Sequence, residues 1–347
     1  DQFYRGHIAE AEAALELEEL PEKDPVLFLV ERGTIRQAAG HYESSAADYI
    51  FAVDLLEALE TYSLSEGAAS FVVNDTVQEF QGKPYEQILV HSMAALSYLA
   101  TGAWDDAAVE ARRLVARLDR AVEAGFPDDP YSRYLAGLCF EMIDDSNGAT
   151  IEYRKAAALL EGLAVEEEDG RIHPSASALP DPPEAFDHEL VCFVMLGGDR
   201  GHMDGAFAEI HWGDQVLGRS YPMAGTAALA AATAEKLAAL RAAKTATRIV
   251  VKESIAQGID GAAGDGWGDL ARIVLIGLLE RPDTRHWETL PASFQVARVP
   301  CPADLTGYQV VLKAAGDHTL RSFDVCEPIM RRRRTFVSFF RDLPAPK

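Results

Sequence analysis

Residues 85–118 read YEQILVHSMAALSYLATGAWDDAAVEARRLVARL, and this stretch decides the fold. It predicts two helices that meet at Thr101-Gly102-Ala103, because apolar residues recur at i, i+3 and i+4 on both sides of that turn. Small and aromatic residues stand where two antiparallel helices must approach closely: Ala95, Tyr98, Gly102, Trp104, Ala107 and Ala111. The stretch therefore predicts a helical hairpin with an apolar face on each helix.

Two further stretches repeat the same internal spacing. The first has Gly33, Gly40, Tyr42, Ser45, Tyr49 and Ala52, and the last has Gly137, Asp144, Ser146, Ala149, Tyr153 and Ala156. Helical hairpins of about 34 residues with this pattern of small and aromatic residues are typical of tetratricopeptide repeats, which stack into a solenoid. We therefore expect a tetratricopeptide-like solenoid, with an ordinary helical bundle as the alternative. A surplus segment, residues 61–84, interrupts the series and is expected to pack on the repeats.

The second half of the chain changes character after Leu163. An acidic run and a proline- and serine-rich run occupy residues 164–187, which we interpret as a linker. Alternating strand patterns follow at 188–196, 206–212, 215–223, 293–300, 308–315, 320–327 and 332–341, with helices at 224–257 and 268–280. The expected class is α+β: an all-α domain at 1–163, and a smaller α+β domain at 188–347 whose sheet is mainly antiparallel.

Composition narrows the possible partners. The chain has 347 residues, of which 48% are hydrophobic, so it can bury a core large enough for about two domains. Its net charge of −23 argues against nucleic acid or an anionic membrane surface as the main partner, because both would repel it. The apolar runs are too short to span a bilayer.

The four cysteines show no CxxC spacing, which argues against a zinc site. Cys139 and Cys192 stand in apolar runs and are expected to be buried thiols. Cys301 and Cys326 stand in strand-like segments, and we expect them to pair if the compartment is oxidising.

The chain resembles a family of uncharacterised bacterial envelope lipoproteins whose N-terminal half is tetratricopeptide-like. The resemblance rests on residues 33–45, on Leu96–Arg113, and on Arg298 and Pro300. Its other motif residues are Asn74, Asp75, Tyr85, Glu86, Asp283, Arg285, Trp287, Leu290 and Pro291. The resemblance implies export to the periplasm, the outer membrane or the cell surface, and acylation at an N-terminal cysteine outside this sequence. It implies no catalytic activity.

The stretch 283–291, DTRHWETLP, suggests catalysis through Asp283, Arg285 and His286. A catalytic unit also needs a base or nucleophile held by a third group. We favour a packed junction between a helix and a strand, with Arg285 paired to a carboxylate and Trp287 buried between the 268–280 helix and the sheet. The enzyme alternative, a hydrolase or ligand-binding enzyme, has its site at Asp283–Trp287.

Two other polar stretches carry weaker functional patterns. Asp199, His202, Asp204, Glu209 and His211 are all metal-ligand types, but their spacing fits neither a helical HxxxH pair nor a calcium loop, so we expect a polar hairpin. The glycine-rich run at 258–269 lacks the GK[ST] of a phosphate-binding loop. We therefore predict no catalytic residue, no metal and no cofactor.

Arginines 331–334 form the one dense basic run of an acidic chain. If the run lies on one strand, alternate residues face opposite sides and two of the four are exposed together. The structural interpretation is a solvated or edge-protecting strand face. The functional interpretation is an anchor for an acidic partner surface or for lipid headgroups, through the candidate contacts Arg331, Arg332, Arg333 and Arg334.

The concave face of the predicted repeats is apolar, and it gives the remaining candidate partner contacts: Leu89, Leu96, Leu99, Tyr131, Tyr134, Leu138 and Met142. An exposed apolar face of this size would promote aggregation. We therefore predict that residues 61–84, through Phe71, Val72, Val73 and Phe80, or an element of the C-terminal domain, fill it.

The sequence thus predicts a non-enzymatic protein–protein interaction scaffold or assembly component of the bacterial cell envelope. Its expected partners are other proteins, including further copies of itself. It contacts a membrane only through the lipid anchor that the resemblance implies.

Overall fold

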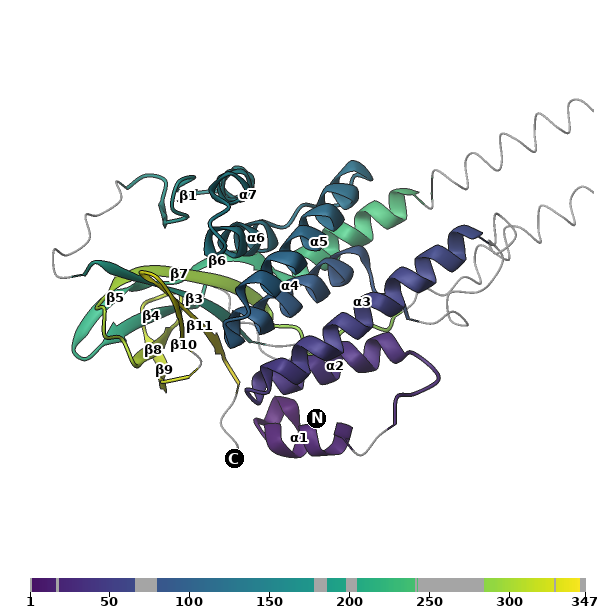
Figure 1. Cartoon of the computed structure of the whole chain (residues 1–347), viewed down its shortest axis with the longest axis horizontal. Helices are drawn as coiled ribbons and strands as arrows, with labels where there is room; N and C mark the ends of the chain where they lie inside the picture. The colour runs from purple at the N-terminus through teal and green to yellow at the C-terminus, as the bar shows by residue number, and fades with distance from the viewer. Residues whose placement is uncertain are drawn as a thin grey trace, which may run out of the picture.

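The computed structural model describes residues 2–16, 19–65, 80–177, 186–197, 205–240, 242, 284–327 and 329–343. The fold is α+β, with helices in the N-terminal half and a mainly antiparallel sheet region after them, as predicted. Figure 1 shows the helices gathered beside the strands. The helical elements are η1 (Phe3–Arg5), α1 (Ile8–Glu16), α2 (Pro25–Ala38), α3 (Tyr42–Ser65), α4 (Pro84–Thr101), α5 (Trp104–Glu123), α6 (Pro130–Met142) and α7 (Ser146–Leu159).

Consecutive helices pack in pairs, and small residues set how closely they approach. Gly33 of α2 faces Tyr49 of α3, and a Cβ atom on this glycine would lie 2.9 Å from the Tyr49 ring. Gly137 of α6 faces Tyr153 of α7 in the same way, at 2.7 Å. Between them, α4 ends at Gly102, whose left-handed backbone lets α5 begin at Trp104. The predicted helical hairpins are therefore present, while the solenoid stays a prediction.

A short β-hairpin follows the helices and lies inside the predicted linker. Strands β1 (Leu163–Val165) and β2 (Ile172–Pro174) pair in antiparallel register. Val165 and Ile172 are buried, and the backbone carbonyl of Gly170 accepts a hydrogen bond of 2.8 Å from the Tyr134 hydroxyl. This part of residues 164–187 is therefore an ordered hairpin docked on the helices.

Two larger sheets make up the rest of the described chain. The five-stranded sheet has the order β10 (Ile329–Arg332), β11 (Thr335–Arg341), β3 (His188–Leu196), β7 (Ser293–Cys301) and β6 (Tyr221–Gly225). The four-stranded sheet has the order β5 (Gln215–Arg219), β4 (Phe207–Trp212), β8 (Tyr308–Lys313) and β9 (Thr319–Val325). Neighbouring strands are antiparallel except β3 and β11, which run parallel.

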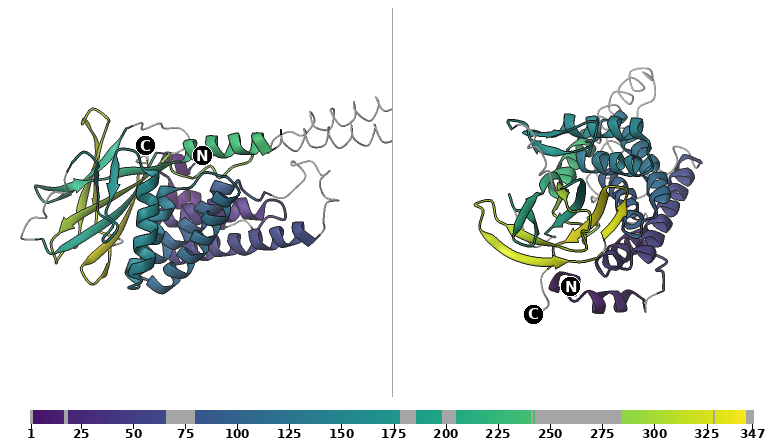
Figure 2. Two further views of the ribbon diagram at one scale, coloured as in Figure 1. Left: turned by 90° about the horizontal axis from the view of Figure 1, so that it is seen from above. Right: turned by 60° about the vertical axis from the view of Figure 1, so that its left-hand side comes forward.

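The five-stranded sheet is the middle of three layers. Side chains alternate along β3: Leu190, Cys192, Val194 and Leu196 face the four-stranded sheet, and Val191, Phe193 and Met195 face the helices. Both faces are buried, which explains why the sequence of this strand is an almost continuous apolar run. In Figure 2 the strands lie at one end of the molecule and the helices at the other.

Helices and sheet share one hydrophobic core. It contains apolar side chains of α2 to α7 together with side chains of β3, β7 and β11. The predicted boundaries at 163 and 188 therefore separate two kinds of secondary structure whose packing is continuous. The division into two domains stays a prediction.

Two predicted strands are wrong in extent. The run 215–223 is divided at Ser220, where the chain passes from β5 in one sheet to β6 in the other. The run 332–341 is divided by a tight turn at Arg333-Arg334, and Arg333 has a positive φ of 56° there. Residues 226–240 form a helix, as predicted, while the expected helix at 268–280 lies outside the described residues.

Candidate functional site

The candidate partner contacts on the helices are covered by the chain's own sheet. Tyr131 lies 4.6 Å from Phe294 and 5.9 Å from Phe193 between ring centroids. All seven predicted contacts belong to the core shared with the sheet: Leu89, Leu96, Leu99, Tyr131, Tyr134, Leu138 and Met142. The prediction that part of the chain fills this face is confirmed for the C-terminal half. All seven are buried, so a partner reaches them only if the packing of the chain itself opens.

The predicted insertion at 61–84 is only partly described. Helix α3 continues to Ser65, and Phe80 is buried just before α4 begins. Phe71, Val72 and Val73 lie outside the described residues, so their predicted contact with the helices stays a prediction.

Two motif residues of the resemblance, Glu86 and Trp287, meet in space. The backbone N–H of Trp287 donates to the Glu86 carboxylate at 2.8 Å, and the backbone N–H of Lys83 donates to the same carboxylate at 2.6 Å. The Trp287 indole N–H donates to Thr34 Oγ1 and Thr289 Oγ1, both at 3.0 Å. Trp287 is 2% exposed, so its predicted burial is confirmed. The predicted place between the 268–280 helix and the sheet is not tested for the helix, which lies outside the described residues; besides Thr289, the contacts of Trp287 given above and its ring contact with Tyr49 are to α2, α3 and α4.

Further polar contacts fasten the segment around Trp287 to the helices. Arg285 forms an ion pair with Asp24, at the start of α2. Glu31 accepts hydrogen bonds from the backbone N–H groups of Glu288 at 2.6 Å and Thr289 at 3.2 Å. Burial raises the pKa of Glu31 to about 7. These contacts form a packed junction. Asn74, Asp75 and Asp283 lie outside the described residues; Tyr85, Leu290 and Pro291 are buried.

Arg298 joins both halves of the molecule through a buried ion cluster. Its guanidinium donates to Glu189 at 2.9 Å, to Glu141 at 2.8 and 3.0 Å, and to the Tyr153 hydroxyl at 3.2 Å. A second hydrogen bond to Glu189 means that all five of its N–H groups are used. Burial alone would lower the pKa of Arg298, but the two carboxylates raise it. This arginine therefore holds β3, β7 and α6 together and has no donor left for a ligand.

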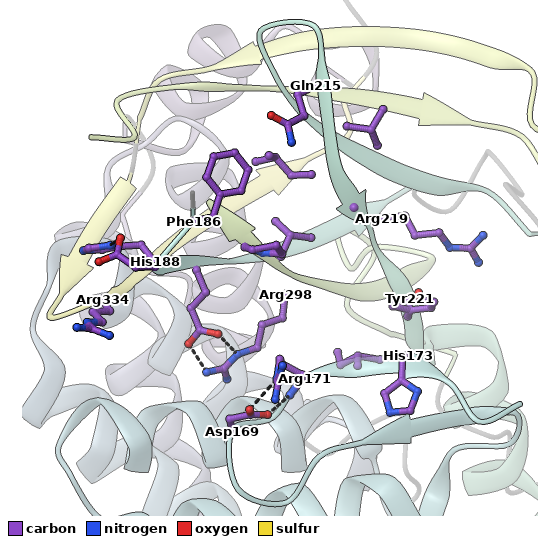
Figure 3. A pocket seen from close by; sticks show the side chains of 18 of the residues that line it. Asp169, Arg171, His173, Phe186, His188, Gln215, Arg219, Tyr221, Arg298 and Arg334 are labelled. Atoms are coloured by element: carbon purple, nitrogen blue, oxygen red, sulfur yellow. Dashed lines mark hydrogen bonds and ion pairs between the residues drawn. The ribbon is translucent and has the colours of Figure 1, made fainter. Parts of the chain in front are cut away.

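A cavity with a volume of about 910 Å³ lies beside this cluster. Its walls come from β2, β5 and the adjoining ends of β3 and β7, as Figure 3 shows. Phe186, Val216, Leu217 and Val299 give it an apolar surface. A volume of this order suits a small ligand or a short peptide segment. The cavity is our candidate functional site. Of the predicted partner contacts only Arg334 lines it, together with Arg298 and Pro300, on which the resemblance rests.

The ionisable groups of the cavity differ in how they are paired. Asp169 pairs with Arg171 at 2.6 Å, and the Asp187 carboxylate accepts a hydrogen bond from His188 at 2.7 Å, which lowers the pKa of Asp187. Arg219 and Arg334 form no close ion pair with a carboxylate among the described residues, although the charge of Arg334 helps to lower the pKa of Asp187. The guanidinium of Arg219 instead stacks on Phe207 at 4.5 Å and on Tyr221 at 5.1 Å.

The run of four arginines, 331–334, is divided among three roles. Arg331 stacks on Phe336 and donates to His188 Nε2 at 2.8 Å, while Arg333 pairs with Asp144 at 2.7 Å in the turn between α6 and α7. Arg334 lines the cavity, and Arg332 is half-buried on β10. The predicted single strand with two exposed arginines is therefore wrong, because the chain turns at Arg333 and three of the four side chains are exposed.

The remaining candidate positions show structural contacts. His211 Nε2 lies 3.1 Å from the Glu209 carboxylate, which also pairs with Lys313 at 3.3 Å. Asp199, His202 and Asp204 lie outside the described residues, as does the glycine-rich run at 258–269. Within the described ranges, no three His, Cys, Asp or Glu side chains gather as metal ligands would.

The expected bond between Cys301 and Cys326 is wrong. All four cysteines are free thiols; Cys326 is exposed and the other three are buried. Cys301 ends a strand of the five-stranded sheet, and Cys326 follows β9 of the other sheet. Burial raises the pKa of Cys192 and of Cys301 to about 12, so both remain protonated thiols at neutral pH.

One signal in the sequence pointed toward the cavity and was missed. The turn dipeptide Asp169-Gly170 stands in a charged loop between the apolar residues Leu163–Val165 and Ile172, and the hairpin β1–β2 that it closes supplies one wall. None of the described helices is both long enough and apolar enough to cross a membrane.

In comparisons with known proteins, no family model and no curated protein matches the chain.

Proposed function

We propose that the protein is a non-enzymatic protein–protein interaction scaffold, or an assembly component, of the bacterial cell envelope. The observation that carries this proposal is the packed junction at Arg285–Pro291. There the residues that resemble a catalytic motif are bonded to helix side chains and to backbone groups. Their polar atoms form hydrogen bonds and an ion pair within the chain, which supports a structural role.

The enzyme alternative called for a deep polar pocket with paired titratable groups around Asp283–Trp287. In the described part of that stretch, Trp287 is buried against Tyr49 and Arg285 is paired with Asp24. These contacts support the scaffold over the enzyme.

The helical hairpins support a repeat domain of the tetratricopeptide class, since Gly33–Tyr49 and Gly137–Tyr153 are equivalent contacts in two of the units. Repeat domains of this kind present extended surfaces to other polypeptides. The envelope location rests on the resemblance to envelope lipoproteins described above.

The test is in-cell photocrosslinking of the full-length protein. A photoreactive residue is placed in separate variants at Val216 in the cavity, Phe51 on α3 and Ile151 on α7, all three of which are exposed. We expect discrete adducts with the same proteins in repeated envelope preparations from at least one position. Monomeric protein at all three positions would overturn the proposal. A matched set without irradiation controls for non-covalent association.

A further inference from the structure

The cavity lies between the open edges of two strands. Among the described residues, β5 pairs only with β4, and β2 pairs only with β1. Residues 215–219 and 171–174 line the cavity consecutively, so backbone as well as side chains borders it. An open strand edge carries unpaired N–H and C=O groups that can pair with another extended chain.

Partly exposed apolar side chains lie on this edge and beside it. Val216 is 52% exposed on β5. Phe186 packs edge-on against Trp212, with 6.2 Å between ring centroids, and Trp212 is itself 38% exposed. Apolar groups next to an open edge favour a partner that supplies both backbone hydrogen bonds and alternate apolar side chains.

The cavity is close to neutral although the chain is strongly acidic, because Arg298 of the lining also pairs with Glu141. The lining holds four arginines against three carboxylates, in a chain whose net charge is −23. In Figure 3, Arg334 and Arg219 lie on opposite sides of the cavity, with Phe186 between them. A guanidinium stacked on aromatic rings, as Arg219 is, keeps its planar set of donors in place for a carboxylate.

We propose that this cavity binds an extended, acidic segment of a partner protein as an added strand on β5, with Arg219 and Arg334 receiving its carboxylates. The inference rests on the proposed function and names the surface and the chemistry of the partner. β5 has five residues, so it can pair with a segment of about 17 Å. The open backbone edge favours a peptide over a small anion, because only a peptide uses both the edge and the arginines.

The experiment measures fluorescence anisotropy of dye-labelled peptides titrated with the full chain. The probe has five residues, the length of β5, alternating glutamate and valine. Three matched peptides are compared with it: one replaces each glutamate with lysine, and two carry N-methyl groups on alternate backbone amides, one peptide for each frame. We expect the lysine peptide to bind at least about tenfold more weakly, because its charge is reversed. We expect N-methylation in one frame to weaken binding by about as much, because it removes the strand hydrogen bonds.

Variants of the chain locate the binding. Arg219→Gln and Arg334→Gln should each weaken binding several-fold, and Arg219→Lys should restore part of the loss at position 219. Arg120→Gln is the matched control, since Arg120 is exposed on α5 and its loss changes the net charge equally. Each variant is first checked for an unchanged melting temperature.

If both N-methylated peptides bind as tightly as the acidic peptide, the proposed pairing with β5 is overturned. Only a general attraction between charges would then remain. Equal binding of the lysine peptide, an unchanged affinity in both Arg→Gln variants, or no binding of the acidic peptide would overturn the site. These outcomes are distinct from failure of the scaffold function. In that failure, crosslinks from Phe51 and Ile151 would be missing as well as those from Val216.

Discussion

Trp287 shows how one residue joins parts of the chain that are far apart in sequence. Its indole N–H reaches Thr34 on α2, its backbone N–H reaches Glu86 on α4, and its ring packs on Tyr49 of α3. Its burial could be predicted from the sequence, because a tryptophan between polar residues in a short junction has few other ways to leave water. Its partners could not be predicted, since they depend on the packing of three helices.

Replacing Trp287 with alanine should lower the free energy of unfolding by about 3–5 kcal/mol, because the variant leaves a cavity beside Tyr49. Trp212→Ala is the control, since Trp212 is partly exposed and its main ring contact is with Phe186. It should cost about 1 kcal/mol. Urea denaturation of both variants measures the difference. Equal losses would show that Trp287 is not part of the core.

Glu31 should make stability depend on pH. Its pKa is about 7 in the folded chain against 4.5 for an ordinary glutamate, so between these values the folded state binds more protons than the unfolded state. The free energy of unfolding should therefore fall as the pH rises from about 4.5 to about 7. Glu31→Gln removes this contribution, so its unfolding free energy should fall less over the same range.

Urea midpoints of parent and variant at several pH values test the role of Glu31. Burial also raises the pKa of Asp129, to about 6, and this group adds a decline of the same sign that remains in the variant. The comparison therefore uses the difference in slope between the two proteins. Identical slopes would show that Glu31 does not titrate in this range.

At the scale of elements, periodicity and turn residues located the helices well. The turn at Thr101-Gly102-Ala103 was correct, because a left-handed glycine and a switch of apolar face mark it locally. β3 was found with its observed bounds, since both of its faces are buried. The turn at Arg333 was missed, because no glycine, proline or asparagine marks it. The parallel pairing of β3 with β11 joins residues distant in sequence, and no local pattern encodes it.

The Arg298 cluster is the contact between elements that we expect to matter most. Arg298→Met would leave Glu141 and Glu189 without their cation, and such a loss inside a protein typically costs about 3–5 kcal/mol. Arg154→Met is the control, because its pair with Glu167 lies on the surface, and it should leave stability unchanged. Thermal melts of the two variants compare them. A stable Arg298→Met protein would mean that apolar packing alone holds β7 against α6.

At the scale of the whole molecule, the helices and the two sheets form three layers around two cores. The five-stranded sheet covers the apolar helical face that the sequence suggested as a binding groove. The sequence predicted that this face would be covered, because exposed apolar surface is unstable in water. The sequence could not identify the element that covers this face, because that depends on which side chains of β3, β7 and β11 face the helices. Partners should therefore meet the cavity beside β5 or the outer helix surfaces.

Hydrogen exchange of the intact chain tests this closed helical face most directly. If the helices and the sheet unfold as one unit, the slowest amides of α4, α6, β3 and β7 should exchange with one common free energy. That value should equal the unfolding free energy measured with urea. Amides of α4 and α6 that exchange with a distinctly lower free energy, while β3 and β7 remain protected, would contradict the account. That result would mean that the helical face opens without unfolding the sheet and is available as a groove.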